Sequence, residues 1–355
     1  MAATSATPTR DEIEHLVARR VQPLLISNTG AAVAVRIDGR TVFFNYGWAD
    51  HASGHPVTSD SLFNLASVRK VFEAVLLAEA ANRGELSLDD PVAKYVTELQ
   101  HGQDIRRVTL GQLATHTSGL LLPQDHPPWP DRGYTLPEFI DTLNRWREDD
   151  EQAPGKQHIY THAGYVLLQL ALERRFGKPI AELLQKRIIA PLGLHATMLP
   201  PRGADGRAKL PPDLMARAVQ GYSESGERIG EPGDQQTYYH FPGTGQMYSS
   251  ARDLAVFVAA NLGELRIDPA LAKGMRRAQQ DLFAISPKNG QGLAWEINYN
   301  SNPPIVEKNG GLNNSSTYLG LIPERKLGLV ILTNRGNQNV AEAGRLILNA
   351  LSAHE

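Results

Sequence analysis

Strand-forming sequence occurs near both ends of this chain, and helix-forming sequence fills most of the long stretch between them. Near the N-terminus, residues 31–36 and 41–46 flank Asp38-Gly39, a dipeptide that is typical of a two-residue hairpin turn. Near the C-terminus a period of two returns in three segments, residues 293–297, 317–322 and 327–333. Strands this far apart in the sequence can share one sheet only where the two ends of the chain meet.

Helix signals lie beside these strands and throughout the middle of the chain. Capping-box spacing recurs at three threonines, Thr9, Thr109 and Thr135. The sequence therefore predicts an α/β (α+β) fold, in which an antiparallel sheet built from both termini is flanked by helices. The expected α/β domain comprises residues 1–84 and 285–355, and a mainly helical domain, residues 85–284, is inserted between its two parts.

Ser67 and Lys70 lie three residues apart at the start of a predicted amphipathic helix that ends near Gly84. Side chains at positions i and i+3 share one face of a helix, so the hydroxyl and the amine can approach each other. A lysine whose pKa is lowered by burial can take the proton from a serine and make it nucleophilic. The same spacing also fits a helix-capping serine followed by a solvated lysine.

Overall composition narrows the classes of function. The chain has 355 residues, a formal net charge of -2, 41% apolar residues and 21% charged residues, which is ordinary globular composition. This charge argues against nucleic acid or an anionic membrane as the main partner. Cysteine is absent, which excludes disulfides, thiolate metal sites and a cysteine nucleophile.

The N-terminal sequence bears on location. Residues 1–12 lack a basic segment followed by an apolar one, so no export signal is visible, and no apolar run approaches the ~20 residues of a membrane span. We therefore expect a cytoplasmic protein without a membrane partner. The alternative is a periplasmic protein whose signal has been removed.

Two further clusters contain groups that could support acyl transfer. Tyr160 and His162 follow a turn and precede a predicted helix, where such residues more often serve packing. A tyrosine near a cationic lysine can ionise, or relay a proton between nucleophile and leaving group. Lys308 and Gly311 belong to a glycine-rich segment, which fits either a hairpin turn or a strand edge that offers a backbone N–H to an oxyanion.

Other catalytic and metal-binding motifs are missing from the sequence. There is no Gly-x-Ser-x-Gly and no His-Glu-x-x-His motif. The histidine pairs His51/His55 and His158/His162 have helical spacing, but neither has an adjacent glutamate or an evident third ligand. We expect no metal and no cofactor.

Taken together, Ser67-Val-Arg-Lys70, Tyr160-Thr-His162 and Lys308-Asn-Gly310 resemble the three motifs of the serine β-lactamase and penicillin-binding protein superfamily. Residues 113–119 and 319–334 also look like segments of that family, and the resemblance covers almost the whole chain. It is nearest to class C β-lactamases and the related esterases and D-amino peptidases. It implies a serine β-lactamase-like fold with the active site at the interface of the two domains.

The resemblance also implies a serine hydrolase that acts through a covalent acyl-enzyme on small-molecule amide or ester substrates. Hydrolysis of β-lactams is the first expectation. The alternative is an esterase, D-peptidase or transacylase with a non-β-lactam substrate. A further alternative is a penicillin-binding protein that is acylated but does not turn over its ligand. A monomer is expected.

The roles of individual residues follow from the same resemblance. Ser67 would be the nucleophile, and Lys70 would accept its proton. Tyr160 would protonate the leaving atom and later activate the deacylating water, while Lys308 would supply positive charge and attract a substrate carboxylate. The backbone N–H groups of Ser67 and Gly311 would form the oxyanion hole.

The expected substrate-binding residues are Gln124, His162, Asn309 and Gly310, and two of them depart from the family's pattern. His162 stands where the family has asparagine, and Asn309 stands where it has threonine or serine. The segment between Trp295 and Lys308 is also shorter than expected for class C enzymes. These differences concern the choice of substrate, and they put recognition of β-lactams in doubt.

Overall fold

The computed structural model describes residues 8–122, 135–200, 210–233 and 246–353. Its main sheet contains β1 (Gly30–Ile37), β2 (Arg40–Asp50), β3 (His55–Pro56), β8 (Phe283–Ser286), β9 (Asn289–Gln291), β10 (Glu296–Asn298), β11 (Ile305–Leu312), β12 (Ser315–Ile322) and β13 (Leu327–Thr333). These nine strands are antiparallel and follow the order β3-β2-β1-β13-β12-β11-β10-β9-β8. Ala31 of β1 lies opposite Thr333 of β13, so the two ends of the chain meet in the sheet, as the sequence predicts.

Helices cover both faces of the sheet and form most of the other regular structure in the described residues. The α-helices are α1 (Arg10–Val21), α2 (Arg69–Asn82), α3 (Leu110–Ala114), α4 (Leu136–Arg145), α5 (His162–Phe176), α6 (Ile180–Leu184), α7 (Pro212–Met215), α8 (Ala251–Asn261), α9 (Pro269–Ala278) and α10 (Val340–Ser352). Short 3₁₀ segments are η1 (Gln22–Leu24), η2 (Ala66–Val68), η3 (Val92–Lys94), η4 (Thr97–His101), η5 (Asp104–Arg107) and η8 (Pro323–Arg325), and η7 (Gln185–Ile189) is a π-helical turn. Two strand pairs outside the sheet are β4 (Phe63–Asn64) with β7 (Tyr248–Ser249) and β5 (Gly221–Tyr222) with β6 (Arg228–Ile229).

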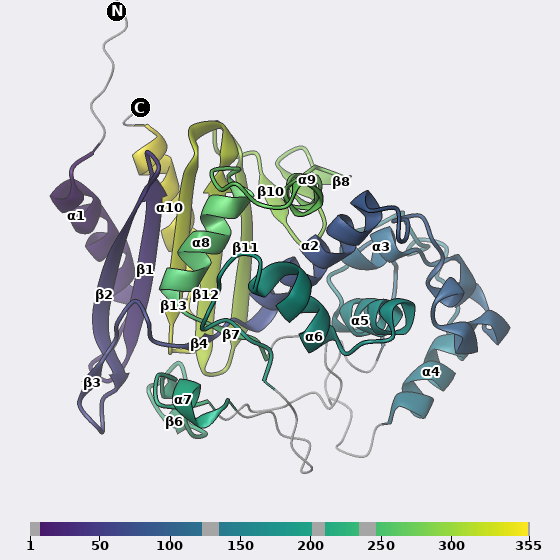
Figure 1. The fold of residues 1–355 in the computed structure, drawn as a ribbon, viewed down its shortest axis with the longest axis horizontal. Helices are drawn as coiled ribbons and strands as arrows, with labels where there is room; N and C mark the ends of the chain where they lie inside the picture. The colour runs from purple at the N-terminus through teal and green to yellow at the C-terminus, as the bar shows by residue number, and fades with distance from the viewer. Residues whose placement is uncertain (1–7, 123–134, 201–209, 234–245, 354–355) are drawn as a thin grey trace, which may run out of the picture.

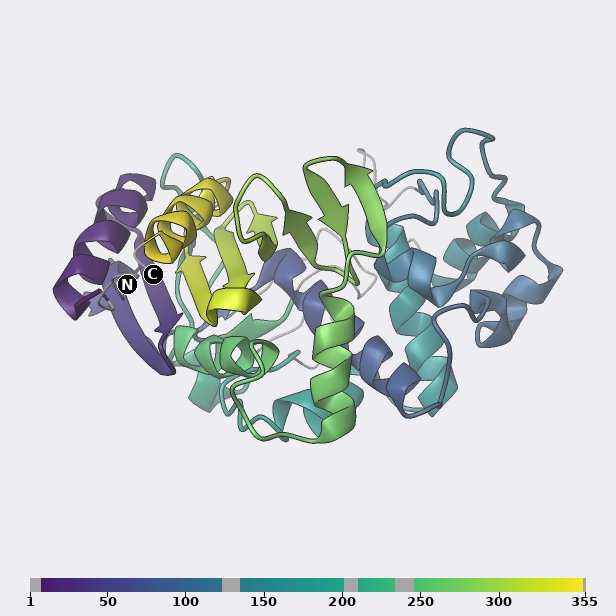
Figure 2. The same cartoon turned by 90° about the horizontal axis from the view of Figure 1, so that it is seen from above.

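The sheet has a hydrophobic layer on each face, and alternate residues of β1 pack in one layer or the other. Val33 and Val35 pack in the cluster that contains residues of α1 and α10, whereas Ala32 and Ala34 pack in the cluster that contains α2 and α8. Figures 1 and 2 show α1 and α10 side by side on one face and α8 on the other. Both faces of β12 and β13 are buried at every position, so these strands carry apolar residues on both faces and not the strict period of two expected from the sequence.

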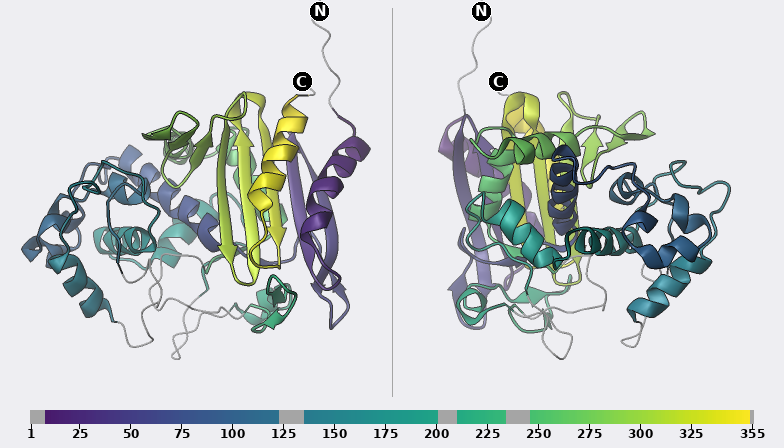
Figure 3. Two further views of the ribbon diagram at one scale, coloured as in Figure 1. Left: turned by 180° about the vertical axis from the view of Figure 1, so that it is seen from behind. Right: turned by 45° about the vertical axis from the view of Figure 1, so that its right-hand side comes forward.

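The helical part of the chain lies to one side of the sheet. Figure 3 shows α3, α4 and α5 grouped there, away from α1 and α10. Helix α8 packs on β1 and β13, although it falls within the range 85–284 that the sequence assigns to the insertion. The three capping boxes form as predicted, at Thr9, Thr109 and Thr135. For residues 308–311 of β11 a strand edge was one of two interpretations of the sequence, because Lys308, Asn309 and two glycines do not form an alternating pattern.

Candidate active site

Ser67 lies in η2, a single turn that leads from β4 into α2. The residue before it, Ala66, has a φ of 50°, a left-handed conformation that is uncommon for a residue with a Cβ atom. Neighbouring elements hold this turn from two sides. The Leu65 carbonyl accepts a hydrogen bond from Thr317 Oγ1 of β12 (2.9 Å), and the Leu65 N–H donates to the Met247 carbonyl (2.8 Å). The position of Ser67 therefore depends on the sheet as well as on its own helix.

Two polar groups from different elements converge on the Ser67 hydroxyl. Tyr160, just before α5, donates a hydrogen bond from its hydroxyl to Ser67 Oγ at 2.7 Å. Lys70, the second residue of α2, places Nζ 3.3 Å from the same oxygen. Lys70 is fully buried, whereas Tyr160 is 37% exposed. A serine hydroxyl between an amine and a phenol has both a proton acceptor and a proton relay within reach.

Burial and neighbouring charges shift the pKa values of this cluster. Burial lowers the pKa of Lys70; Tyr160 opposes that shift, and the charge of Lys308 adds to it. For Tyr160 burial acts in the opposite direction, but the charges of Lys70 and Lys308 prevail and lower its pKa. The two ammonium groups lie 5.2 Å and 4.9 Å from the centre of the Tyr160 ring. Both shifts favour a neutral amine and an ionisable phenol, which are the forms that proton transfer needs.

Lys308 lies in the middle of β11, opposite Leu319 of β12. Its side chain is only 2% exposed, and Nζ donates to Glu296 Oε1 of β10 at 2.8 Å. Although burial opposes the shift, the carboxylate of Glu296 raises the pKa of Lys308 and keeps it cationic. Glu296 did not stand out in the sequence, because an acidic residue in a predicted strand gives no sign of its partner.

The glycines after Lys308 bring β11 close to the nucleophile. A Cβ atom on Gly310 would lie 2.5 Å from the Leu65 carbonyl oxygen and 2.9 Å from the Ser67 nitrogen. The backbone of η2 therefore packs directly on this strand. A Cβ atom on Gly311 would meet no atom within 4 Å, so that residue borders open space. Ser67 and Gly311 thus lie on adjacent stretches of backbone, as an oxyanion hole requires.

Histidines surround Tyr160. His162 is the first residue of α5, and its ring centre lies 5.5 Å from that of Tyr160. Burial, followed by the charges of Lys70 and Lys308, lowers the pKa of His162 to about 3. His116 is fully buried with its ring centre 4.3 Å from that of Tyr160, and its Nδ1 accepts from the Thr161 N–H (3.3 Å).

The structure brings together most of the residues that the sequence singled out. Ser67, Lys70, Tyr160 and Lys308 form one cluster, and Gly310 packs against its backbone. Asn309 is exposed in β11 and lies opposite Tyr318. Gln124 lies outside the described residues. His116 belongs to residues 113–119, a segment of the family resemblance, but nothing in the sequence linked it to Tyr160.

No group of three or more His, Cys, Asp or Glu side chains in the described residues could hold a metal ion. None of the helices in this part of the chain is long and apolar enough to cross a membrane.

Comparison with known proteins identifies the family. The family model described as Beta-lactamase matches residues 17–353. A beta-lactamase of Escherichia coli (strain K12) is 31% identical, over 98% of this chain and 96% of that protein. The chain belongs to the beta-lactamase family. A beta-lactamase of Pseudomonas fluorescens is 26% identical over 96% of this chain and 99% of its own length.

Solved structures of the beta-lactamase family agree with this assignment. A class C beta-lactamase matches with a TM-score of 0.84 and 26% identity, and the match covers 98% of both chains. A D-alanine carboxypeptidase from Burkholderia cenocepacia matches with a TM-score of 0.80 and 27% identity, over 96% of this chain and 100% of that one. The predicted fold class is confirmed, and so is the prediction of a serine hydrolase of the beta-lactamase type that acts on small molecules.

Proposed function

We propose that this beta-lactamase-family protein hydrolyses amide or ester bonds through an acyl-enzyme on Ser67, with β-lactams as its first class of substrate. The observation that carries the proposal is the convergence of Tyr160 and Lys70 on Ser67 Oγ, at 2.7 Å and 3.3 Å. Names of relatives support the substrate class, since several are beta-lactamases. The site would lie where residues 1–84 and 285–355 meet the inserted residues 85–284. The monomeric state and the cytoplasmic location stay predictions from the sequence.

In the acylation step, Ser67 Oγ attacks the acyl carbon and its proton moves to the neutral amine of Lys70. The oxyanion that forms accepts hydrogen bonds from the backbone N–H groups of Ser67 and Gly311. The bond to the leaving nitrogen or oxygen then breaks, and Tyr160 donates its proton to that atom. Lys70 returns a proton to Tyr160, which leaves the acyl-enzyme with a neutral amine and a neutral phenol.

In the deacylation step, Tyr160 with Lys70 takes a proton from a water molecule, and the hydroxide attacks the acyl carbon. The carbon–Oγ bond breaks, and the proton passes to Ser67 Oγ. The charge of Lys308 favours the phenolate form of Tyr160 in both steps. The products are the carboxylic acid and the starting enzyme.

Cleavage of non-β-lactam esters or D-alanyl peptides is the second candidate function. One solved relative is a D-alanine carboxypeptidase, and the side chains of His162 and Asn309 differ from the family's pattern at substrate-binding positions. The acyl-enzyme chemistry would be the same, and only the preferred acyl group would change.

Intact-mass spectrometry over time tests both candidates. Wild type and Ser67→Ala are incubated with a penicillin, a cephalosporin, a p-nitrophenyl ester and a D-alanyl-D-alanine peptide. We expect an adduct on wild type that forms and decays with at least one compound, and no adduct on Ser67→Ala. Equal acylation and turnover of both proteins would refute the assignment of Ser67. An adduct that persists for hours with every compound would instead indicate a protein that binds without turnover.

A further inference from the structure

Tyr160 lies in an irregular segment, residues 146–161, that connects α4 to α5. The tyrosine belongs to neither a helix nor a strand, so no regular hydrogen-bond ladder fixes its position. The 2.7 Å contact between its hydroxyl and Ser67 Oγ therefore depends on what holds the residues on either side of it.

Both neighbours of Tyr160 donate their backbone N–H groups to one residue, His116. The Ile159 N–H donates to the His116 carbonyl at 2.7 Å, and the Thr161 N–H donates to His116 Nδ1 at 3.3 Å. The His116 ring also lies against the Tyr160 ring, with centres 4.3 Å apart and 33° between the planes. A single residue thus contacts the backbone on both sides of the tyrosine and its ring.

His116 has a well-defined position of its own, two residues after the end of α3. Its φ of 56° is a left-handed conformation, and its side chain is fully buried. The nearby Ala114 carbonyl accepts from the Tyr165 hydroxyl of α5 and from the Ala294 N–H, both at 2.9 Å. The backbone next to His116 is therefore tied to α5 and to the segment before β10, so it can support the residues around Tyr160.

The Nδ1 atom of His116 can accept a hydrogen bond only while it carries no proton. Burial, followed by the charges of Lys308 and Lys70, lowers the pKa of His116 well below its ordinary value, so the ring is neutral near pH 7. The proton then lies on Nε2, which has no hydrogen-bond partner among the described residues. The hydrogen bond that the ring makes here is therefore the one at Nδ1.

We propose that His116 is a positioning residue that keeps the Tyr160 hydroxyl on Ser67 Oγ by holding the backbone at residues 159 and 161. His116 acts through Tyr160 and takes no proton itself. This inference rests on the proposed function, because it assumes that Tyr160 relays a proton during acyl transfer at Ser67. Loss of the Nδ1 acceptor should then slow turnover only while residue 160 is a tyrosine.

Two amide substitutions at His116 separate this role from the filling of space. In His116→Asn the side-chain oxygen is attached to Cγ, as Nδ1 is in histidine, so it can still accept from the Thr161 N–H. In His116→Gln the oxygen lies one carbon further out, nearer to the place of Nε2. Glutamine is the larger of the two amides, so it would be the better replacement for a residue that only fills space.

The measured quantity is kcat for p-nitrophenyl acetate, after subtraction of the rate of Ser67→Ala. We expect His116→Gln to lower kcat about 10–100-fold, because a displaced proton relay loses its alignment with the reacting atoms. His116→Asn should stay within about fivefold of wild type, because the acceptor for the Thr161 N–H is kept.

The same two variants in a Tyr160→Phe background show whether the effect passes through Tyr160. There the two amides should have kcat values within about twofold of each other, because the hydroxyl that His116 positions is already gone. Thr115→Val is the control for a disturbed segment. It removes the hydroxyl that donates to the Gly111 carbonyl (2.9 Å) and lies 2.8 Å from Thr117 Oγ1, and it should keep the wild-type kcat.

Three results would overturn the inference. They are a folded His116→Gln within about twofold of wild type, a loss of more than about fivefold in folded His116→Asn, or an undiminished difference between the two variants in the Tyr160→Phe background. Circular dichroism and melting curves show which variants are folded, and the His116→Asn result decides the matter if His116→Gln does not fold. Failure of the proposed function would look different, because Ser67→Ala would then hydrolyse the ester as fast as wild type.

Discussion

Histidines His116 and His162 flank the ring of Tyr160, and burial lowers the pKa of both. Positive charge next to the phenol therefore comes from Lys308, and from Lys70 when it holds a proton, and not from imidazolium. This arrangement separates two tasks. The lysines set the electrostatics of proton transfer, and the neutral rings fill space around Tyr160 without adding a group that titrates near pH 7.

The buried histidines have a consequence for stability in acid. His162 has a pKa of about 3 in the folded protein, against an ordinary value of 6.5. Between these values the unfolded chain binds the extra proton, so stability is full above pH 6.5 and falls as the pH falls toward 3. For His162→Asn, the loss of unfolding free energy between pH 7 and pH 4.5 should be about 2–3 kcal/mol smaller than for wild type.

Urea midpoints and slopes at the two pH values measure this difference. His15→Asn removes a histidine from the exposed side of α1 and should follow wild type. If His162→Asn loses as much stability in acid as wild type, His162 is not the neutral buried group described here.

At the scale of elements, the contact between β11 and η2 decides where the nucleophile lies. β10 pairs with β11 only up to Glu307, and beyond that point η2 lies against β11. A Cβ atom added to Gly310 would lie within 3 Å of the Leu65 carbonyl oxygen, just before η2, and of the Ser67 nitrogen within η2. Thr317 of β12 also donates a hydrogen bond to the Leu65 carbonyl, which keeps the start of η2 close to the sheet.

Gly310→Ala should therefore impair catalysis more than stability. The added methyl group would push η2 away from β11 and separate the two proposed oxyanion donors, at a cost of about 10²–10³ in kcat/KM. Gly311→Ala is the matched comparison, because its methyl group meets open space and its N–H is kept. Steady-state kinetics on one substrate and melting temperatures measure the two effects. Equal losses in both variants would contradict this account of the contact.

Local sequence signals predicted many of the elements, because caps and alternating strands depend on neighbouring residues. The Thr9 capping box, the hairpin at Asp38 and the strands at residues 317–322 and 327–333 formed where expected, whereas the strand predicted at residues 293–297 lies at Glu296–Asn298. The extent of β11 and the roles of Glu296 and His116 were not predictable in this way. Each depends on a partner distant in the sequence, such as Lys308 for Glu296 and Tyr160 for His116.

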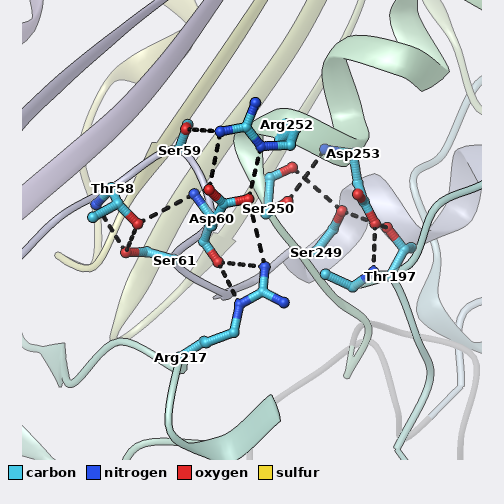
Figure 4. Close-up of polar contacts among 11 residues, drawn as sticks. Thr58, Ser59, Asp60, Ser61, Thr197, Arg217, Ser249, Ser250, Arg252 and Asp253 are labelled. Atoms are coloured by element: carbon cyan, nitrogen blue, oxygen red, sulfur yellow. Dashed lines mark hydrogen bonds and ion pairs between the residues drawn. The ribbon is translucent and has the colours of Figure 1, made fainter. Parts of the chain in front are cut away.

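At the scale of the whole molecule, two aspartates link segments that are far apart in the sequence (Figure 4). Asp60, before β4, pairs with Arg252 of α8 at 2.8 Å and 3.0 Å, and its side chain is 47% exposed. Asp253, the next residue of α8, is 7% exposed and accepts from the Ala196 N–H and the Thr197 hydroxyl, both at 2.8 Å. The link through Asp60 is therefore exposed to solvent, whereas the link through Asp253 is buried.

This difference predicts unequal effects on stability. Asp253→Ala should cost about 2–3 kcal/mol of unfolding free energy, since it leaves a buried N–H and a buried hydroxyl without their acceptor. Asp60→Ala should cost less than about 1 kcal/mol, because an exposed ion pair is weakened by solvent. Urea unfolding of both variants beside wild type measures the costs. A larger loss for Asp60→Ala would reverse this ranking of the two links.

The pairing of β1 with β13 also constrains synthesis of the protein. A ribosome completes β1 early, but the partner of Ala31 in the sheet, Thr333, emerges only after roughly 300 further residues. Until then β1 has one open edge, and until β11 and β12 are made, η2 lacks Gly310 and Thr317, which hold it in place. The hydrolase can therefore complete the site around Ser67 only after roughly 240 further residues, and a chain that stops before β11 would carry Ser67 without Lys308 and Gly311.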